Sequence, residues 1–66
     1  MGIRKYRKLR KLTQHELAIA VGVTQAYISS LENGKRANPS IKVLIKIADV
    51  LRVDVRKLLR AEKEAV

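Results

Sequence analysis

Apolar residues recur at helical spacing along most of this chain, and no segment alternates between apolar and polar residues as a strand does. Near the N-terminus four of them lie three residues apart, which predicts an amphipathic helix over 3–12. These four are Ile3, Tyr6, Leu9 and Leu12. Over 41–51 the apolar residues recur at spacings of three and four, as in a helix with one buried face. The pattern therefore predicts an all-α fold.

Capping residues divide the middle of the chain into two short helices. Thr13 is followed three residues later by Glu16, a spacing typical of a capping box, which predicts that a second helix begins here. Gly22 is expected to end it, because glycine takes the left-handed conformation without steric cost. Thr24 can then cap a third helix over 25–33.

Ser40 and Asp54 are the expected caps of a fourth and a fifth helix. The fifth helix would turn Val55, Leu58 and Leu59 inward. The prediction is a compact five-helix bundle that forms one domain over 1–66. Within it, the two central helices occupy about 13–33, the fourth and fifth helices occupy 40–60, and 61–66 form a frayed tail.

The outer face of the third helix carries small or amide-bearing side chains and no carboxylate. Its residues are Gln25, Ala26, Ser29 and Ser30, whereas Ile28 and Leu31 would face the core. A helix that enters a DNA groove needs low bulk together with directional donors and acceptors. Glutamine can pair with adenine, and an alanine methyl can touch a thymine methyl. This face is therefore a candidate surface for reading bases.

Charge supports a polyanionic partner. The 66 residues include 15 Lys and Arg against 6 Asp and Glu, a net charge of +9. Nucleic acid is the first candidate partner and an anionic membrane surface the second, while a basic surface kept for solubility remains the plain alternative. The chain has no cysteine, and its longest apolar run, 17–23, is too short to span a bilayer. A cytoplasmic protein without a membrane segment is expected.

Nothing in the sequence points to an enzyme. The chain has one histidine, His15, and no second histidine or cysteine to form a metal or nucleophile site with it. Its acidic residues are candidates for capping or for a buried ion pair. We therefore expect no catalytic residue, metal, cofactor or small-molecule substrate.

The segments TQHELAIAVGVTQAYISSLENGK and NPSIKVLIKIADVLRVDVRKLL resemble the phage repressor and Cro-like helix-turn-helix domains, also called the XRE family. The resemblance extends from Ile3 to Leu59 and implies a lambda-repressor-like fold that binds DNA. Two features depart from the family pattern. Lys11 stands where a glycine is common, and Ile19 and Ala20 replace residues that are usually polar.

The resemblance also implies roles for individual residues. Gln25, Ala26 and Ser30 would read base edges, Gln14 would meet the DNA backbone, and the loop after the third helix would hold phosphates. The DNA-binding residues implied in this way are Gln14, Thr24, Gln25, Ala26, Tyr27, Ser29, Ser30, Asn33, Lys35 and Arg36. Arg7 and Glu32 match a structural ion pair that joins the first helix to the end of the third.

The expected function is a sequence-specific transcriptional regulator of double-stranded DNA, a repressor that binds a two-fold symmetric operator as a homodimer. The candidate dimer interface consists of Val43, Ile45, Val50, Val53, Val55 and Leu59. Two alternatives stay open at this point. One is an antitoxin or antirepressor-type module that binds protein, and the other is a nonspecific binder of polyanions or membrane surfaces.

Overall fold

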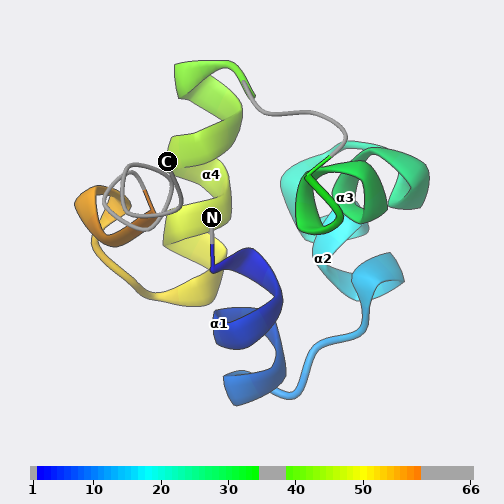
Figure 1. Cartoon of the computed structure of the whole chain (residues 1–66), viewed down its shortest axis with the longest axis horizontal. Coiled ribbons are helices and arrows are strands. Elements are labelled where there is room, and N and C mark those ends of the chain that lie inside the picture. The colour runs from blue at the N-terminus through cyan, green and yellow to red at the C-terminus, as the bar shows by residue number, and fades with distance from the viewer. Residues whose placement is uncertain (1, 35–38, 59–66) are drawn as a thin grey trace.

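The computed structural model describes residues 2–34 and 39–58, and within these ranges it contains helices and no strand (Figure 1). Four helices are α1 (Ile3–Leu9), α2 (Gln14–Val21), α3 (Gln25–Glu32) and α4 (Ile41–Leu51). Residues 55–58 are also helical and begin the fifth helix. The predicted all-α, five-helix architecture is confirmed. The expected frayed tail, 61–66, lies outside the described residues.

The helices surround one hydrophobic core. α2 packs against α3 and α4, and α1 contacts the same two helices. In Figure 1, α2 and α3 lie together on one side, while α4 stands between them and the start of the fifth helix. The buried apolar residues come from every helix: Ile3, Leu17, Ala18, Val21, Ile28, Leu31, Leu44, Ile47, Ala48, Leu51 and Leu58.

The predicted starts of the second, third and fourth helices have the expected caps. The hydroxyl of Thr13 accepts a hydrogen bond from the Glu16 backbone N–H at 3.0 Å, and the Glu16 carboxylate accepts one from the Thr13 N–H at 2.9 Å. Thr24 caps α3 and Ser40 caps α4 in the same way, each through its hydroxyl oxygen. The turn between α2 and α3 is thus held at both helix starts by side chains that the sequence identified.

The first helix is shorter than expected. It ends at Leu9 instead of continuing to Leu12, because Lys11 takes the left-handed conformation with a φ of 58°. The Leu12 N–H then bonds back to the Arg7 carbonyl at 3.1 Å, which turns the chain away from the helix axis. The predicted apolar stripe was therefore wrong at Leu9, whose side chain is 66% exposed.

Left-handed residues also end α2 and α4. Gly22 has a φ of 87°, as expected for the turn between α2 and α3. Arg52 has a φ of 56° after α4, and the Val53 N–H bonds to the Ala48 carbonyl at 3.0 Å. Lys11 and Arg52 are the two non-glycine residues with positive φ in the described ranges, so each stores backbone strain of about 1–2 kcal/mol.

Candidate nucleic-acid interface

The outer face of α3 presents the polar residues that the sequence singled out. Gln25 and Ala26 are exposed, and Ser29 and Ser30 are half-buried. Ile28 and Leu31 on the opposite face are buried in the core. Their burial fixes the rotation of α3 about its own axis, so the same polar side chains always face outward.

The first turn of α3 contains a shallow depression lined by Thr24, Ala26, Tyr27 and Ser30. The Thr24 hydroxyl oxygen accepts a hydrogen bond from the Tyr27 backbone N–H at 3.1 Å, which leaves the hydroxyl proton available as a donor. The depression therefore combines hydroxyl groups with a methyl group and an aromatic ring. Such a surface can accommodate both the polar and the apolar parts of a base edge.

Glu32, the last residue of α3, is held by side chains from α1 and α2. Arg7 donates from Nε to Oε2 at 2.7 Å and from Nη2 to Oε1 at 3.1 Å. Gln14 donates from Nε2 to Oε1 at 3.1 Å. The Glu32 side chain has no exposed surface, and that of Arg7 is 11% exposed. The residues paired by the family resemblance are thus in direct contact, and their contact joins three helices.

Both members of this pair are ionised. Burial acts to raise the pKa of Glu32, but hydrogen bonds from Arg7, Gln14 and Arg4 outweigh it and the pKa is lowered. The hydrogen bond from Glu32 raises the pKa of Arg7. Arg7 also donates from Nη1 to the Leu12 carbonyl at 2.7 Å. Every buried polar side-chain atom in the described ranges has a hydrogen-bond partner.

The position of Gln14 adds a function that the sequence reasoning missed. The family resemblance assigns this residue to the DNA backbone, and the structure places it half-buried in the first turn of α2. Because its Nε2 donates to Glu32, the side chain has a fixed orientation toward the end of α3. Gln14 therefore couples α2 to α3.

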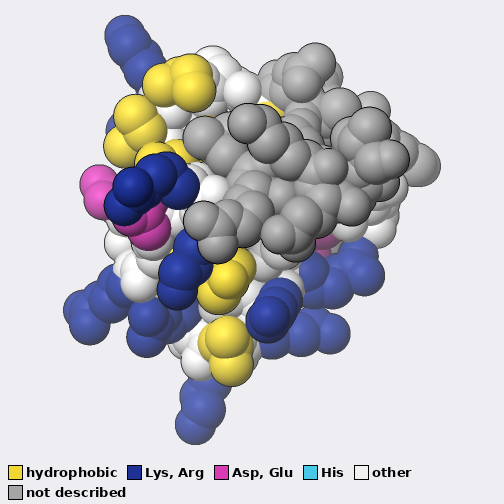
Figure 2. Space-filling view, turned by 60° about the vertical axis from the view of Figure 1, so that its left-hand side comes forward, with side chains coloured by type: hydrophobic (Ala, Val, Ile, Leu, Met, Phe, Trp, Pro, Cys, Tyr) yellow, Lys and Arg dark blue, Asp and Glu magenta, His cyan; other side chains and the backbone are white. Residues whose placement is uncertain are grey.

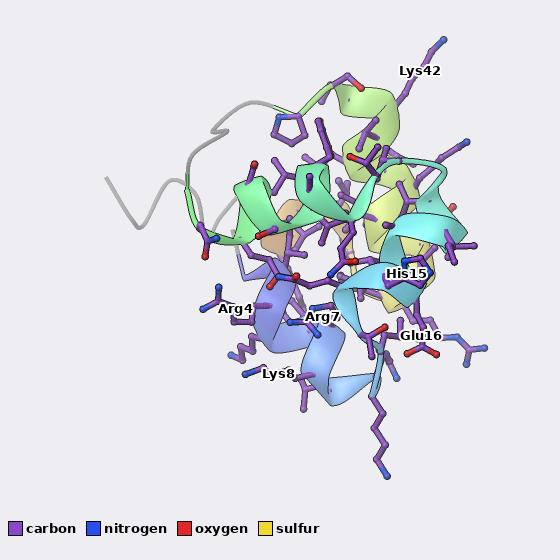
Figure 3. The ribbon with its side chains drawn as sticks, turned by 90° about the vertical axis from the view of Figure 1, so that its right-hand side faces the viewer. Arg4, Arg7, Lys8, His15, Glu16 and Lys42 are labelled. Atoms are coloured by element: carbon purple, nitrogen blue, oxygen red, sulfur yellow. The ribbon has the colours of Figure 1, made fainter. Side chains whose placement is uncertain are left out.

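Arg4 of α1 and Arg10, which follows the last residue of α1, make further contacts that were not expected. Arg4 donates from Nε to Glu32 Oε1 at 3.2 Å and from Nη2 to Asn33 Oδ1 at 2.9 Å. Arg10 donates from Nε to the Leu51 carbonyl at 2.7 Å, at the C-terminal end of α4. One feature of the sequence could have indicated these contacts. Arg4, Arg7 and Arg10 are spaced three residues apart, which places them on one side of a helix. Figure 3 labels Arg4 and Arg7, which both extend from α1.

Positive charge is spread beyond the face formed by α2 and α3. Figure 2 shows Lys and Arg side chains over much of the described part of another face, with several hydrophobic side chains among them. A net charge of +9 on a molecule with extents of 28 × 22 × 20 Å creates a long-range attraction for polyanions. This attraction does not depend on the base sequence of a nucleic acid.

The residues expected at the dimer interface differ in exposure. Ile45 is 46% exposed, and its neighbour one turn earlier, Ile41, is 63% exposed although it was not predicted as an interface residue. The four expected valines are half-buried and pack against the core: Val43, Val50, Val53 and Val55. Leu59 lies outside the described residues, as do the expected phosphate contacts Lys35 and Arg36.

The described residues were also compared with the requirements of a metal site and of a membrane-spanning helix. The described ranges contain no group of three or more His, Cys, Asp and Glu residues that could hold a metal ion. No helix within those ranges is long and apolar enough to cross a membrane. His15 is exposed on α2, and Ile19 on the same helix is 66% exposed.

Comparisons with known proteins agree with this geometry. The profile of the family described as helix-turn-helix matches residues 3–58. SinR, an HTH-type transcriptional regulator of Bacillus subtilis (strain 168), is 42% identical over 62 residues, which cover 94% of this chain and 56% of SinR. The ImmF control region 10 kDa protein of Bacillus phage phi105 is 39% identical over 64 residues, which cover 97% of this chain and 70% of that protein.

A solved structure extends the comparison to the fold. The crystal structure of SinR, a master regulator for biofilm formation, in complex with DNA has a TM-score of 0.82 and 44% sequence identity, covering 86% of this chain and 90% of that one. The chain spans about half the length of the curated relatives it matches, between 40% and 56% for three of them. The chain belongs to the helix-turn-helix family of the phage repressor and Cro-like (XRE) type, a family of binding domains and not of enzymes.

Proposed function

We propose that this chain is a sequence-specific, double-stranded DNA-binding domain that regulates transcription. The observation that carries the proposal is the outer face of α3, where exposed polar side chains without a carboxylate stand on a helix fixed by buried Ile28 and Leu31. Membership of the helix-turn-helix family supports it. The likeness to SinR, whose complex with DNA has been solved, supports it as well.

In the proposed mode, α3 enters the major groove and α2 crosses the sugar-phosphate backbone. Gln25, Ala26 and Ser30 read base edges, with Thr24, Tyr27 and Ser29 beside them. Gln14 and the loop 33–36 contact phosphates, which set the position of α3 in the groove. The net charge of +9 raises affinity for any duplex, so specificity depends on the contacts of α3.

The proposed regulator is a cytoplasmic repressor that acts as a homodimer. A single α3 contacts only a few base pairs, whereas two copies related by two-fold symmetry read two half-sites about 10 bp apart. The dimer surface is proposed on α4 and the fifth helix, where Ile45 is exposed and four valines are half-buried. Ile41 extends the exposed apolar surface of α4 by one turn.

Selection of bound sequences from a random duplex pool tests the proposal. The expected result is a two-fold symmetric consensus whose half-sites are about one helical turn apart. A pool that shows no consensus after repeated selection contradicts sequence-specific binding. A consensus without symmetry leaves base readout in place and contradicts the homodimer.

The exposed pair Ile41 and Ile45 also favours a second candidate, a module of antitoxin or antirepressor type whose main contact is a protein. Under that alternative the apolar surface of α4 binds another protein, and DNA binding is weak and nonspecific. A chain that is monomeric in solution and binds selected and random duplexes equally tightly supports this alternative. A dimer that prefers its selected duplex supports the repressor.

A further inference from the structure

The C-terminal end of α3 carries one more cation than its buried carboxylate requires. Arg7 already places one hydrogen bond on each carboxylate oxygen of Glu32 and balances its charge. Arg4 adds a second guanidinium to the same carboxylate, at 3.2 Å, while its own side chain stays 50% exposed. Two arginines and one glutamate leave a net positive charge at this end of the helix.

The remaining donors of Arg4 are available to a ligand. A guanidinium has five N–H donors in a planar fork. The contacts of Arg4 within the described ranges use two of them, one to Glu32 and one to Asn33. The other three are free for an acceptor, and a forked guanidinium matches the geometry of a phosphate.

Arg4 also sets the orientation of the Asn33 amide. A guanidinium can only donate, so the atom that faces Arg4 at 2.9 Å must be the amide oxygen. The amide nitrogen is then turned the other way, where it donates to the Ser29 hydroxyl at 3.3 Å. One of its two hydrogens remains for another acceptor. Arg4 and Asn33 thus present hydrogen-bond donors from the same corner of the molecule.

A phosphate at this corner needs a cation for electrostatic reasons. The C-terminal end of a helix carries a partial negative charge, which repels an anion. Asn33 caps α3 at that end, so its amide alone would place a phosphate against unfavourable carbonyl dipoles. The surplus charge of Arg4 offsets this repulsion, because its guanidinium lies within hydrogen-bond distance of Asn33.

We propose that Arg4 and Asn33 together bind one phosphate of the DNA backbone beside the groove that α3 enters. The inference rests on the proposed function and adds α1 to the DNA-binding surface. Arg4 acts twice in this arrangement, as a direct donor to the phosphate and as the group that orients the Asn33 amide. The charge of Arg4 therefore does more than attract DNA at long range.

Binding of the selected operator duplex by wild type, Arg4→Gln and Lys8→Gln tests the proposal. Lys8 is the matched control, because it lies one turn further along the same side of α1 and is exposed. Both substitutions remove one positive charge. Arg4→Gln is expected to weaken binding about ten-fold or more and to reduce the salt slope by about one per contact. Lys8→Gln is expected to change affinity less than three-fold.

Operators that carry a single neutral methylphosphonate supply the second measurement. At one backbone position per half-site, neutralisation should weaken wild type about ten-fold and leave the already weakened Arg4→Gln unchanged. Two results overturn the Arg4 contact and leave the proposed function intact. One is an equal loss of affinity in Arg4→Gln and Lys8→Gln. The other is a methylphosphonate effect that is the same in wild type and Arg4→Gln at every position. A wild type that binds no duplex in a salt-dependent way overturns both.

Discussion

Arg7 of α1 holds the carboxylate of Glu32 at the end of α3 through two hydrogen bonds, of 2.7 and 3.1 Å, and both side chains are almost completely buried. The pair links the N-terminal helix to the helix proposed to read DNA. Gln14 of α2 donates to the same carboxylate, so this one acidic side chain also joins α2 to the end of α3. The pair is therefore a structural support for the proposed DNA-binding face.

Replacing Glu32 by leucine should lower the free energy of unfolding by about 3–5 kcal/mol, because Arg7 is left as a buried charge without its partner. Urea unfolding followed by circular dichroism measures the change. The double variant Arg7→Met with Glu32→Leu should recover most of the loss, since it removes both charges. A single variant that loses less than about 1 kcal/mol contradicts the assigned role of the pair.

Acid should destabilise the fold through the same carboxylate. The pKa of Glu32 is lower in the folded chain than its ordinary value of 4.5, so the folded state binds fewer protons than the unfolded state. The resulting stability is fully present above about pH 4.5 and is lost as the pH falls through the folded pKa. The Arg7→Met, Glu32→Leu double variant should show a flatter decline in the free energy of unfolding below pH 4.5.

Asp54 supplies a control for this pH dependence. Hydrogen bonds from the Arg56 side chain and backbone lower the pKa of Asp54 from 3.8 to about 2. Its contribution is therefore present above pH 3.8 and is lost between there and about pH 2. Asp54→Asn should change the free energy of unfolding only through its pH dependence below pH 3.8. If it removed the decline near pH 4.5, the assignment of that decline to Glu32 would be wrong.

The caps and the periodicity were enough to predict most of the fold. Thr13, Thr24 and Ser40 cap the helices as expected, because each acts on backbone groups three residues away. The end of the first helix was not predictable in this way. Its apolar spacing continues to Leu12, and only the left-handed backbone at Lys11 breaks the helix before that point. The family resemblance pointed to this position, because a glycine is common in the family where Lys11 stands.

The polar network was harder to predict than the exposed face of α3. An outward-facing residue such as Gln25 follows from helical periodicity alone. The contacts of Arg4 and Gln14 with Glu32 join residues 28 and 18 positions apart, so they depend on how three helices pack. The contact of Arg10 with Leu51 spans 41 positions. Sequence spacing gives no distance for such pairs.

Lys11→Gly should raise the free energy of unfolding by about 0.5–1 kcal/mol. Glycine removes the strain of a left-handed lysine, and its greater freedom in the unfolded chain offsets part of the gain. Thermal unfolding of Lys11→Gly and wild type measures the difference in stability. Ala20→Gly, on the exposed face of α2, is the control and should lower stability by about 1 kcal/mol. A loss of stability in Lys11→Gly would mean that the left-handed turn is not strained.

Arg10→Ala should lower the free energy of unfolding by about 1 kcal/mol, because the guanidinium caps the carbonyl end of α4. Arg10→Lys keeps the charge but loses the planar fork, and should recover only part of that loss. Lys8→Ala, which removes an exposed lysine of α1, should stay within about 0.5 kcal/mol of wild type. Equal stabilities for all three variants would contradict a stabilising role of Arg10 at the end of α4.

The claim that α3 reads base edges is tested most directly by comparing wild type and Gln25→Ala on the selected operator and on its single-base-pair variants. Wild type is expected to discriminate by about 1–3 kcal/mol at the base pair opposite Gln25, and Gln25→Ala is expected to lose this discrimination at that position while keeping it elsewhere. Unchanged discrimination at every base pair in Gln25→Ala would contradict base reading by this residue.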